Sequence, residues 1–326
     1  MDVIKYPKVL EDISKIEGVK KNLLLGNGFS TVFAPDVFGY DSLFNTAKQS
    51  LSSRMKEVFE RAGETNFERA LRLYDDAIWL AQVYQKELGK TIEHERDEIR
   101  NLLIQAILDN HPDDQSFMTK EAREKAYAFL KQYSNIFTTN YDLILYWISM
   151  QEMKSKGSWD DGFRKRDGIL CFTGFEDSSR IYYIHGALHY VRSGSFLKKL
   201  SWSIDHDRLK TLITSSITNG DYPVFVAEGR WDKKQSQIEN DFYLRSCFDA
   251  LNAMHGVLVV FGHSLNPDFD RHILERILNA SNLERIYFGV FGDNPQRDYS
   301  ELLKFVSRHQ SGSKFTFFQS ETVGLG

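Results

Sequence analysis

The feature that most constrains the fold is an apolar run that stops at two glycines, KNLLLGNGFSTVF, at residues 21–33. Its three consecutive leucines, Leu23 to Leu25, suit a strand that is covered on both faces, as in a parallel sheet, although three leucines alone fit a helix equally well. The glycines favour the strand, because they permit positive φ and let backbone N–H groups approach an anion closely. Two explanations fit this turn when it is taken alone: a purely steric need for glycine, or a nucleotide site. We weigh the first against the second at roughly two to one.

Strand-like segments alternate with helical ones along the chain, which predicts a parallel, doubly wound, Rossmann-like sheet of the α/β class. Four of the strand-like segments end in small or polar residues, at 26–30, 139–142, 185–186 and 262–264. In sheets of this kind, ligands bind in the crevice at the carboxyl ends of the strands. The four segments are therefore predicted to converge on one ligand crevice.

Helical periodicity continues through residues 41–133, too far for one crossover connection, so we expect a large inserted helical layer. The chain is expected to form a single domain over residues 1–326, with loop or hairpin insertions at 150–167 and 188–222. The core of the domain is predicted to consist of residues 20–40, 134–150, 168–190 and 222–320.

Charge and cysteine usage exclude several classes of protein. The 41 basic and 45 acidic residues leave a net charge of −4, which argues against a nucleic-acid-binding surface. No signal peptide and no apolar stretch of membrane-spanning length is recognisable, so a cytoplasmic protein without a membrane partner is expected. Only Cys171 and Cys247 are present, which excludes a disulfide framework and a cysteine zinc site.

Three polar residues stand out as candidates for chemistry. Asn140, at a strand end, offers a ligand both a hydrogen-bond donor and an acceptor. Asp142 follows at the start of a predicted helix, where a carboxylate is a good N-cap without any further role. His185 ends another strand, and a histidine with an ordinary pKa of about 6.5 can accept a proton near neutral pH. Isolated histidines are more often structural, and nine are present; His263 is a rival ligand contact, whereas His189 on a predicted hairpin is expected to face solvent.

Together the four segments resemble motifs of the sirtuin superfamily, in the same order along the chain. G-N-G-F-S (26–30) resembles the sirtuin Gly-Ala-Gly-x-Ser turn, and T-N-Y-D (139–142) resembles Gln-Asn-x-Asp. His185 and Gly186 resemble the catalytic His-Gly, and G-H-S-L (262–265) resembles the Gly-Thr/Ser-Ser loop.

Two departures accompany the resemblance. Sirtuin deacylases carry a four-cysteine zinc module, which two separated cysteines cannot build, and their Pro-Asp-Phe-Arg motif is reduced here to A-P-D-V at residues 34–37. With the helical insertion, these departures resemble a bacterial sirtuin-like branch of antiphage defence whose members hydrolyse NAD. The stretch from Glu228 to Ile273 is also similar to an uncharacterised bacterial family of that clan.

The resemblance implies an enzyme that takes NAD as its substrate, releases nicotinamide and ADP-ribose, uses no metal and depletes NAD in abortive infection. It implies catalytic roles for Asn140, His185 and Asp142. It also implies contacts to NAD for a wider set of residues: Gly26, Asn27, Gly28, Phe29, Ser30, Thr139, Tyr141, Gly186, Gly262, His263, Ser264, Asp270 and Asp293.

Two other functions remain open at this point. One is a non-catalytic module that binds NAD or ADP-ribose, although a pure binder needs neither Asn140 nor His185. The other is a protein deacylase, which the missing zinc module disfavours. Because NAD depletion must be held off in healthy cells, a homo-oligomer or a separate sensor subunit, itself able to bind a nucleotide, is expected as a partner. The helical block at 51–133 is expected to be the assembly surface, or simply a cover for the sheet.

Overall fold

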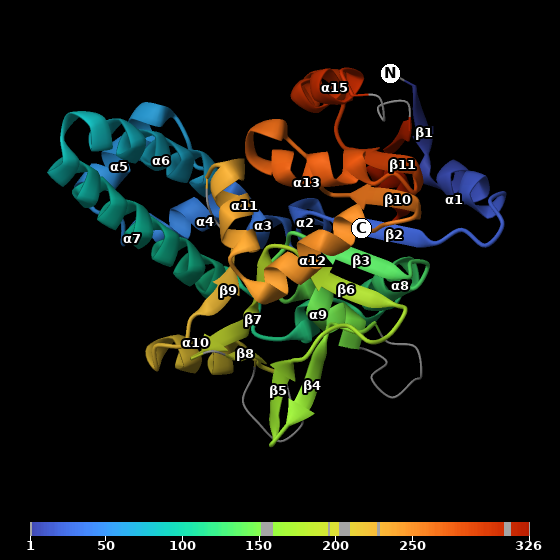
Figure 1. The fold of residues 1–326 in the computed structure, drawn as a ribbon, viewed down its shortest axis with the longest axis horizontal. Coiled ribbons are helices and arrows are strands. Elements are labelled where there is room, and N and C mark those ends of the chain that lie inside the picture. The colour runs from blue at the N-terminus through green and yellow to red at the C-terminus, as the bar shows by residue number, and fades with distance from the viewer. Residues whose placement is uncertain are drawn as a thin grey trace.

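A seven-stranded, wholly parallel sheet forms the centre of the molecule (Figure 1). The computed structural model describes residues 2–150, 159–194, 196–201, 209–226, 229–309 and 314–325. From one edge to the other the strands are β1 (Val3–Lys5), β12 (Phe315–Gln319), β11 (Leu283–Val290), β10 (Gly256–Phe261), β2 (Lys21–Leu25), β3 (Asn135–Thr138) and β6 (Arg180–Tyr183). The predicted α/β class with a Rossmann-like parallel sheet is confirmed.

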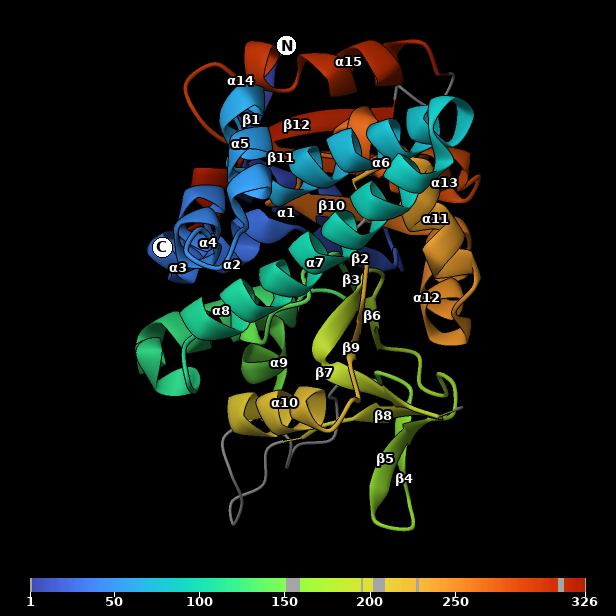
Figure 2. The same cartoon turned by 90° about the vertical axis from the view of Figure 1, so that its left-hand side faces the viewer.

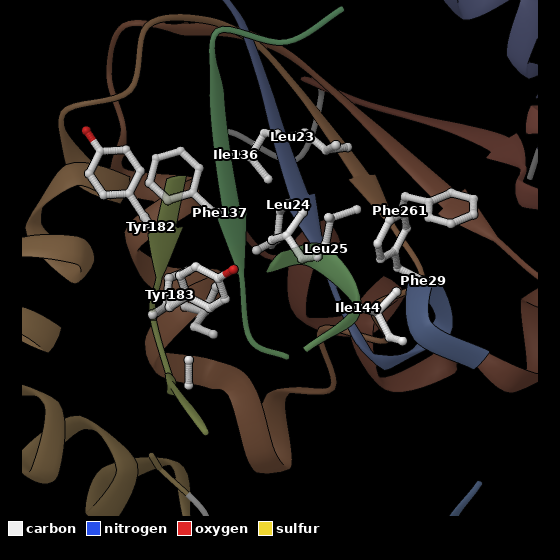
Figure 3. Close-up of a cluster of buried hydrophobic side chains, with 14 of the residues drawn as sticks. Leu23, Leu24, Leu25, Phe29, Ile136, Phe137, Ile144, Tyr182, Tyr183 and Phe261 are labelled. Carbon is white, nitrogen blue, oxygen red and sulfur yellow. The ribbon is translucent and has the colours of Figure 1, made fainter. Parts of the chain in front are cut away.

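The central strand β2 is apolar because both of its faces are covered. Leu23, Leu24 and Leu25 are each fully buried. Figure 3 shows them packed among side chains from neighbouring elements, including Ile136 of β3 and Phe261 of β10. The run of leucines that the sequence left open between strand and helix is thus a strand, with a neighbour hydrogen-bonded on each side.

The order of the strands reverses beside β2. The chain passes from β2 to β3 and then β6 in one direction, and later returns to β10, β11 and β12 in the other. β2 and β10 are neighbours in the sheet, and the loops that follow them lead away in opposite directions. This is the topological switch point at which open α/β sheets bind their ligands.

Helices cover both faces of the sheet, and a helical hairpin extends to one side. In Figure 2, α11 (Trp231–Glu239), α12 (Phe242–Asn252) and α13 (Pro267–Asn279) lie on one side of the strands, and α9 (Ile144–Ser149) lies on the other. The predicted helical insertion is confirmed, and it consists of α4 (Tyr40–Ala47), α5 (Ser53–Ala62), α6 (Phe67–Tyr84), α7 (Lys86–Asn110) and α8 (Lys120–Leu130). The remaining helices are α1 (Tyr6–Ser14), α2 (Asn27–Phe33), α3 (Pro35–Phe38), α10 (Leu209–Thr218), α14 (Pro295–Asp298) and α15 (Ser300–Ser307).

A second, antiparallel sheet was not predicted. Its strands, in order, are β4 (Phe163–Arg166), β5 (Ile169–Phe172), β8 (Phe196–Lys199), β7 (Gly186–Ser193) and β9 (Pro223–Phe225). Two strands expected in the core, β5 and β9, belong to this sheet instead. The predicted hairpin is the β7–β8 pair, although residues 202–208 of the expected insertion at 188–222 and residues 151–158 of the expected loop at 150–167 lie outside the described residues.

The change from one sheet to the other occurs at Gly186. Its φ is +77°, and a Cβ atom there would lie 1.9 Å from the carbonyl oxygen of Val224 in β9. Glycine is needed because the chain turns and packs directly against β9. The next histidine, His189, is fully buried against Tyr146 and Tyr190, so the expectation that it faces solvent is wrong. That face of β7 packs on α9 rather than facing water.

Candidate functional site

A pocket of about 1010 Å³ opens at the carboxyl ends of the parallel strands. Its walls come from the loops after β2, β3, β6 and β10, from α6 and α7 of the helical insertion, and from the C-terminal residues. The four strand ends that were predicted to converge therefore all contribute residues to one pocket. The predicted site residues that line the pocket are Asn27, Gly28, Thr139, Asn140, Tyr141, Asp142, His185, Gly262, His263, Ser264 and Asp270.

Five predicted residues do not line the pocket. Phe29 is fully buried in the core, and Ser30 is buried behind the pocket wall. Gly26 packs against the loop after β10, whereas Gly186 packs against β9. Asp293 lies in the exposed loop after β11. Of these five, Ser30 alone hydrogen-bonds, through its side chain, to residues that line the pocket.

The glycines after β2 are explained first by contact between two loops. The N–H of Gly28 donates to the carbonyl oxygen of Gly262 over 2.8 Å, and a Cβ on Gly28 would lie 2.6 Å from the Cα of Gly262. The N–H of Phe29 donates to the carbonyl oxygen of Gly26 over 2.9 Å. Two of the first N–H groups of α2 are thus engaged within the protein, so the glycines let the two loops meet rather than leaving a set of free donors for an anion.

The Asn140 amide is held in one orientation. Its Nδ2 group donates to the carbonyl oxygen of Gly26 over 3.0 Å and to Oγ of Ser30 over 2.9 Å. A carbonyl oxygen can only accept, so the nitrogen must face Gly26, and both amide protons are used. The acceptor Oδ1 makes no hydrogen bond to the part of the chain that the structure describes, and it is the atom that Asn140 can offer to a ligand.

Asp142 positions this amide from behind. Oγ of Ser30 donates to Oδ2 of Asp142 over 2.6 Å, and the N–H of Ile144 donates to Oδ1 over 2.8 Å. The N-cap residue of α9 is Leu143, one residue after the predicted Asp142, but Asp142 accepts from the first N–H of the helix and also fixes the hydroxyl that holds Asn140. Burial raises the pKa of Asp142 to about 6, against the opposing effect of these two donors.

His185 is hydrogen-bonded to a second histidine that the sequence did not identify. Nε2 of His185 and Nε2 of His272 are 3.2 Å apart, and both residues are buried. Burial, followed by the positive charge of Lys234, holds the pKa of His185 well below its ordinary value. Burial lowers the pKa of His272 to about 3. Both imidazoles are therefore neutral at physiological pH.

A buried lysine ties the helical insertion to this corner of the pocket. Nζ of Lys234, in α11, lies 3.2 Å from Glu68 of α6 and 3.3 Å from Asp270 of α13. Burial opposes each charge, but Asp270 and Glu68 raise the pKa of Lys234, and Lys234 lowers that of Asp270. The sequence signal was a lysine four residues before the buried Ile238, on the apolar face of a helix.

Three side chains in this corner are of types that can bind a metal. Ligand atoms of His185, Asp270 and His272 lie within 4.8 Å of one another, and two imidazoles with a carboxylate suit zinc and related ions. The two rings, however, lie end to end, with centroids 5.5 Å apart, planes 14° apart and the Nε2 atoms between them. That is the geometry of a direct N–H···N hydrogen bond, and the Lys234 ammonium already faces Asp270.

The fold and the pocket define a class: a Rossmann-like α/β protein with a pocket at its switch point, walled on one side by a helical insertion. Residues 23–325 match the family described as a domain of unknown function, DUF4917, and the chain belongs to that family. A search of curated proteins returned no match. Among the helices that the structure describes, none has the length and apolar character needed to cross a membrane.

Proposed function

We propose that this protein hydrolyses NAD at the bond between nicotinamide and ribose, giving nicotinamide and ADP-ribose. The observation that carries the proposal is that Asn140 and His185 line one pocket at the switch point of a parallel sheet, where dinucleotides bind in folds of this kind. The pocket volume of about 1010 Å³ is at the upper end of the usual range for ligand sites, roughly 300–1,000 Å³. The order of the four sirtuin-like motifs supports the same substrate.

The reaction does not need a strong general acid, because the leaving group departs without being protonated. The bond from ribose C1′ to the ring nitrogen breaks, nicotinamide leaves as a neutral molecule with the electron pair, and water adds to C1′ and loses a proton. The enzyme must hold the ribose and stabilise its positive charge. Oδ1 of Asn140, the negative end of a fixed amide dipole, suits both tasks, and Asp142 acts through Ser30 to keep it in place.

Release of nicotinamide from NAD by the purified protein tests the proposal. We expect Asn140→Ala and His185→Ala to lower the rate at least about 100-fold, since loss of one fixed polar group at a reacting centre commonly costs that much. Asn252→Ala and His94→Ala, at exposed positions away from the pocket, are matched controls and should retain the wild-type rate. Equal turnover by the site variants and the controls would overturn the assignment of the site.

The second candidate function is a module that binds NAD or ADP-ribose without turning it over. The observation that favours it is the low pKa of His185, because a general base is most effective with a pKa near the working pH. Calorimetric binding of NAD with no nicotinamide release under any condition would support the binder over the enzyme.

Under this proposal the protein acts in the cytoplasm as an effector of antiphage defence, depleting NAD in an infected cell. It is kept inactive through a homo-oligomer or a sensor subunit. The exposed apolar residues of α6 and α7 support a contact of this kind, because large exposed apolar groups gathered on one element mark interaction surfaces.

A further inference from the structure

The pair formed by His185 and His272 has one shared proton and two possible arrangements. Both rings are neutral, so each carries one N–H. In the first arrangement, Nε2–H of His272 donates to Nε2 of His185, and the proton of His185 is on Nδ1. In the second arrangement, His185 donates through Nε2–H, and the proton of His272 is on Nδ1.

The surroundings of His272 distinguish the two arrangements. Its Nδ1 atom is buried and has no hydrogen-bond partner in the described part of the chain. A proton there would be a buried donor without an acceptor, which costs about 1–3 kcal/mol and is rarer in proteins than an unpaired acceptor. A bare Nδ1 in the same place is the smaller cost. The geometry therefore favours the arrangement in which His272 is the donor.

We infer that His272 donates its Nε2 proton to His185 and thereby holds His185 as the tautomer that presents Nδ1–H to the pocket. His185 lines the pocket, and its Nδ1 makes no hydrogen bond to the described residues, so this N–H is the group it offers a ligand. His272 does not line the pocket and is a positioning residue.

The inference also defines the ligand group that fits, and here it rests on the proposed function. Asn140 offers only the acceptor Oδ1, because both of its amide protons are used. His185 offers only a donor. A hydroxyl group can accept from one and donate to the other, as can a water molecule, so the pair suits a sugar hydroxyl such as those of the ribose next to nicotinamide. His185 thus acts first as a hydrogen-bond donor, not as a base.

Nitrogen NMR of the full-length protein labelled with ¹⁵N-histidine tests the tautomer without any ligand. We expect Nδ1 of His185 to show the protonated type of nitrogen shift and Nε2 the bare type, with the reverse for His272. The signals are assigned by their loss in His185→Gln and His272→Gln. Protonation of His185 on Nε2 in the wild type would overturn the inference. A shift of both Nε2 signals on addition of one equivalent of Zn²⁺ would also overturn it, because the two nitrogens would then be metal ligands.

Two variants of His272 distinguish a role in positioning His185 from a role in packing alone. His272→Gln keeps an amide N–H that can reach His185, so the Nδ1–H tautomer should persist. His272→Phe fills similar space without a donor, so His185 should shift toward a mixture of tautomers. An unchanged tautomer in His272→Phe would contradict the assigned role. If either variant fails to fold, the wild-type spectrum still decides the question.

Two ligands that differ by one sugar test the recognised group. ADP-ribose carries a second ribose that ADP lacks, so ADP-ribose should move the Nδ1–H resonance of His185 and ADP should not. Binding of ADP-ribose that leaves this resonance unmoved would overturn the hydroxyl assignment. If ADP-ribose does not bind at all, the proposed function and the ligand class fail together, whereas the tautomer stands on the ligand-free spectrum.

Discussion

At the scale of the residue, Ser30, Asn140 and Asp142 form a chain of hydrogen bonds in which each side chain limits what its neighbour can do. Asp142 accepts a hydrogen bond from the Ser30 hydroxyl. The oxygen of that hydroxyl can therefore accept a hydrogen bond from the Asn140 amide. This arrangement buries a carboxyl group, and burial raises its pKa from 3.8 to about 6. The orientation of Asn140 is thus maintained at a cost in stability at neutral pH.

That cost predicts a pH dependence. Between pH 3.8 and about 6 the folded protein holds a proton that the unfolded chain releases, so the Asp142 contribution to the free energy of unfolding falls as pH rises through this window. Asp142→Asn lacks the titration. Its stability relative to wild type should rise by about 2 kcal/mol from pH 4 to pH 7, as measured by urea unfolding. The lost Ser30 bond is the same at each pH and does not affect this slope. Asn252→Ala, at an exposed position without a titratable group, is the control and should show no such trend.

At the scale of the element, Lys234 joins three helices that are far apart in the sequence. It connects α11 to Glu68 of α6 and to Asp270 of α13, and both carboxylates line the pocket. The helical insertion is therefore tied to the pocket by a buried charge as well as by apolar packing.

Removing the lysine should leave two carboxylates beside each other without a cation. Lys234→Met is expected to lower the free energy of unfolding by about 3–5 kcal/mol, the usual cost of breaking a buried ion pair. Lys233→Met, an exposed neighbour, should change it by less than about 0.5 kcal/mol. Adding Glu68→Gln and Asp270→Asn to Lys234→Met should restore most of the loss. A loss below about 1 kcal/mol in the single variant would show that the charges are not coupled as described.

At the scale of the whole molecule, the α6–α7 hairpin extends from the body at the end opposite β1 and α1 (Figure 1). Its outer side carries large apolar residues with high exposed fractions, including Trp79 at 64%, Val83 at 72% and Tyr84 at 84%. The opposite side of α6 is buried against the rest of the insertion. This outer side is where we expect copies of the chain to associate.

Sedimentation velocity tests that expectation. The double variant Val83→Glu, Tyr84→Glu should weaken self-association at least about tenfold, corresponding to about 1.4 kcal/mol, because it buries charge at the contact. Phe242→Glu, at an equally exposed aromatic residue on α12, is the control and should associate as wild type does. A wild-type chain that is monomeric at all concentrations would direct attention to a separate sensor subunit.

Local sequence patterns were sufficient to predict the features that depend on neighbouring residues. Apolar runs ending in glycine or a polar residue are properties of a few neighbouring residues, and they predicted the parallel strands and the placement of Asn140 and His185 at one pocket. Helical periodicity likewise predicted the insertion at 41–133. These predictions succeeded because parallel strands all carry their carboxyl ends to the same edge.

Contacts between residues far apart in the sequence became visible only in the folded molecule. The second sheet depends on how β9 meets Gly186, the need for glycine after β2 depends on the loop after β10, and neither contact leaves a local signal. The pairing of His185 with His272 joins residues 87 positions apart. Burial there removes water from both rings and lowers both pKa values, so both imidazoles stay neutral, and this loss of hydration exists only in the packed molecule.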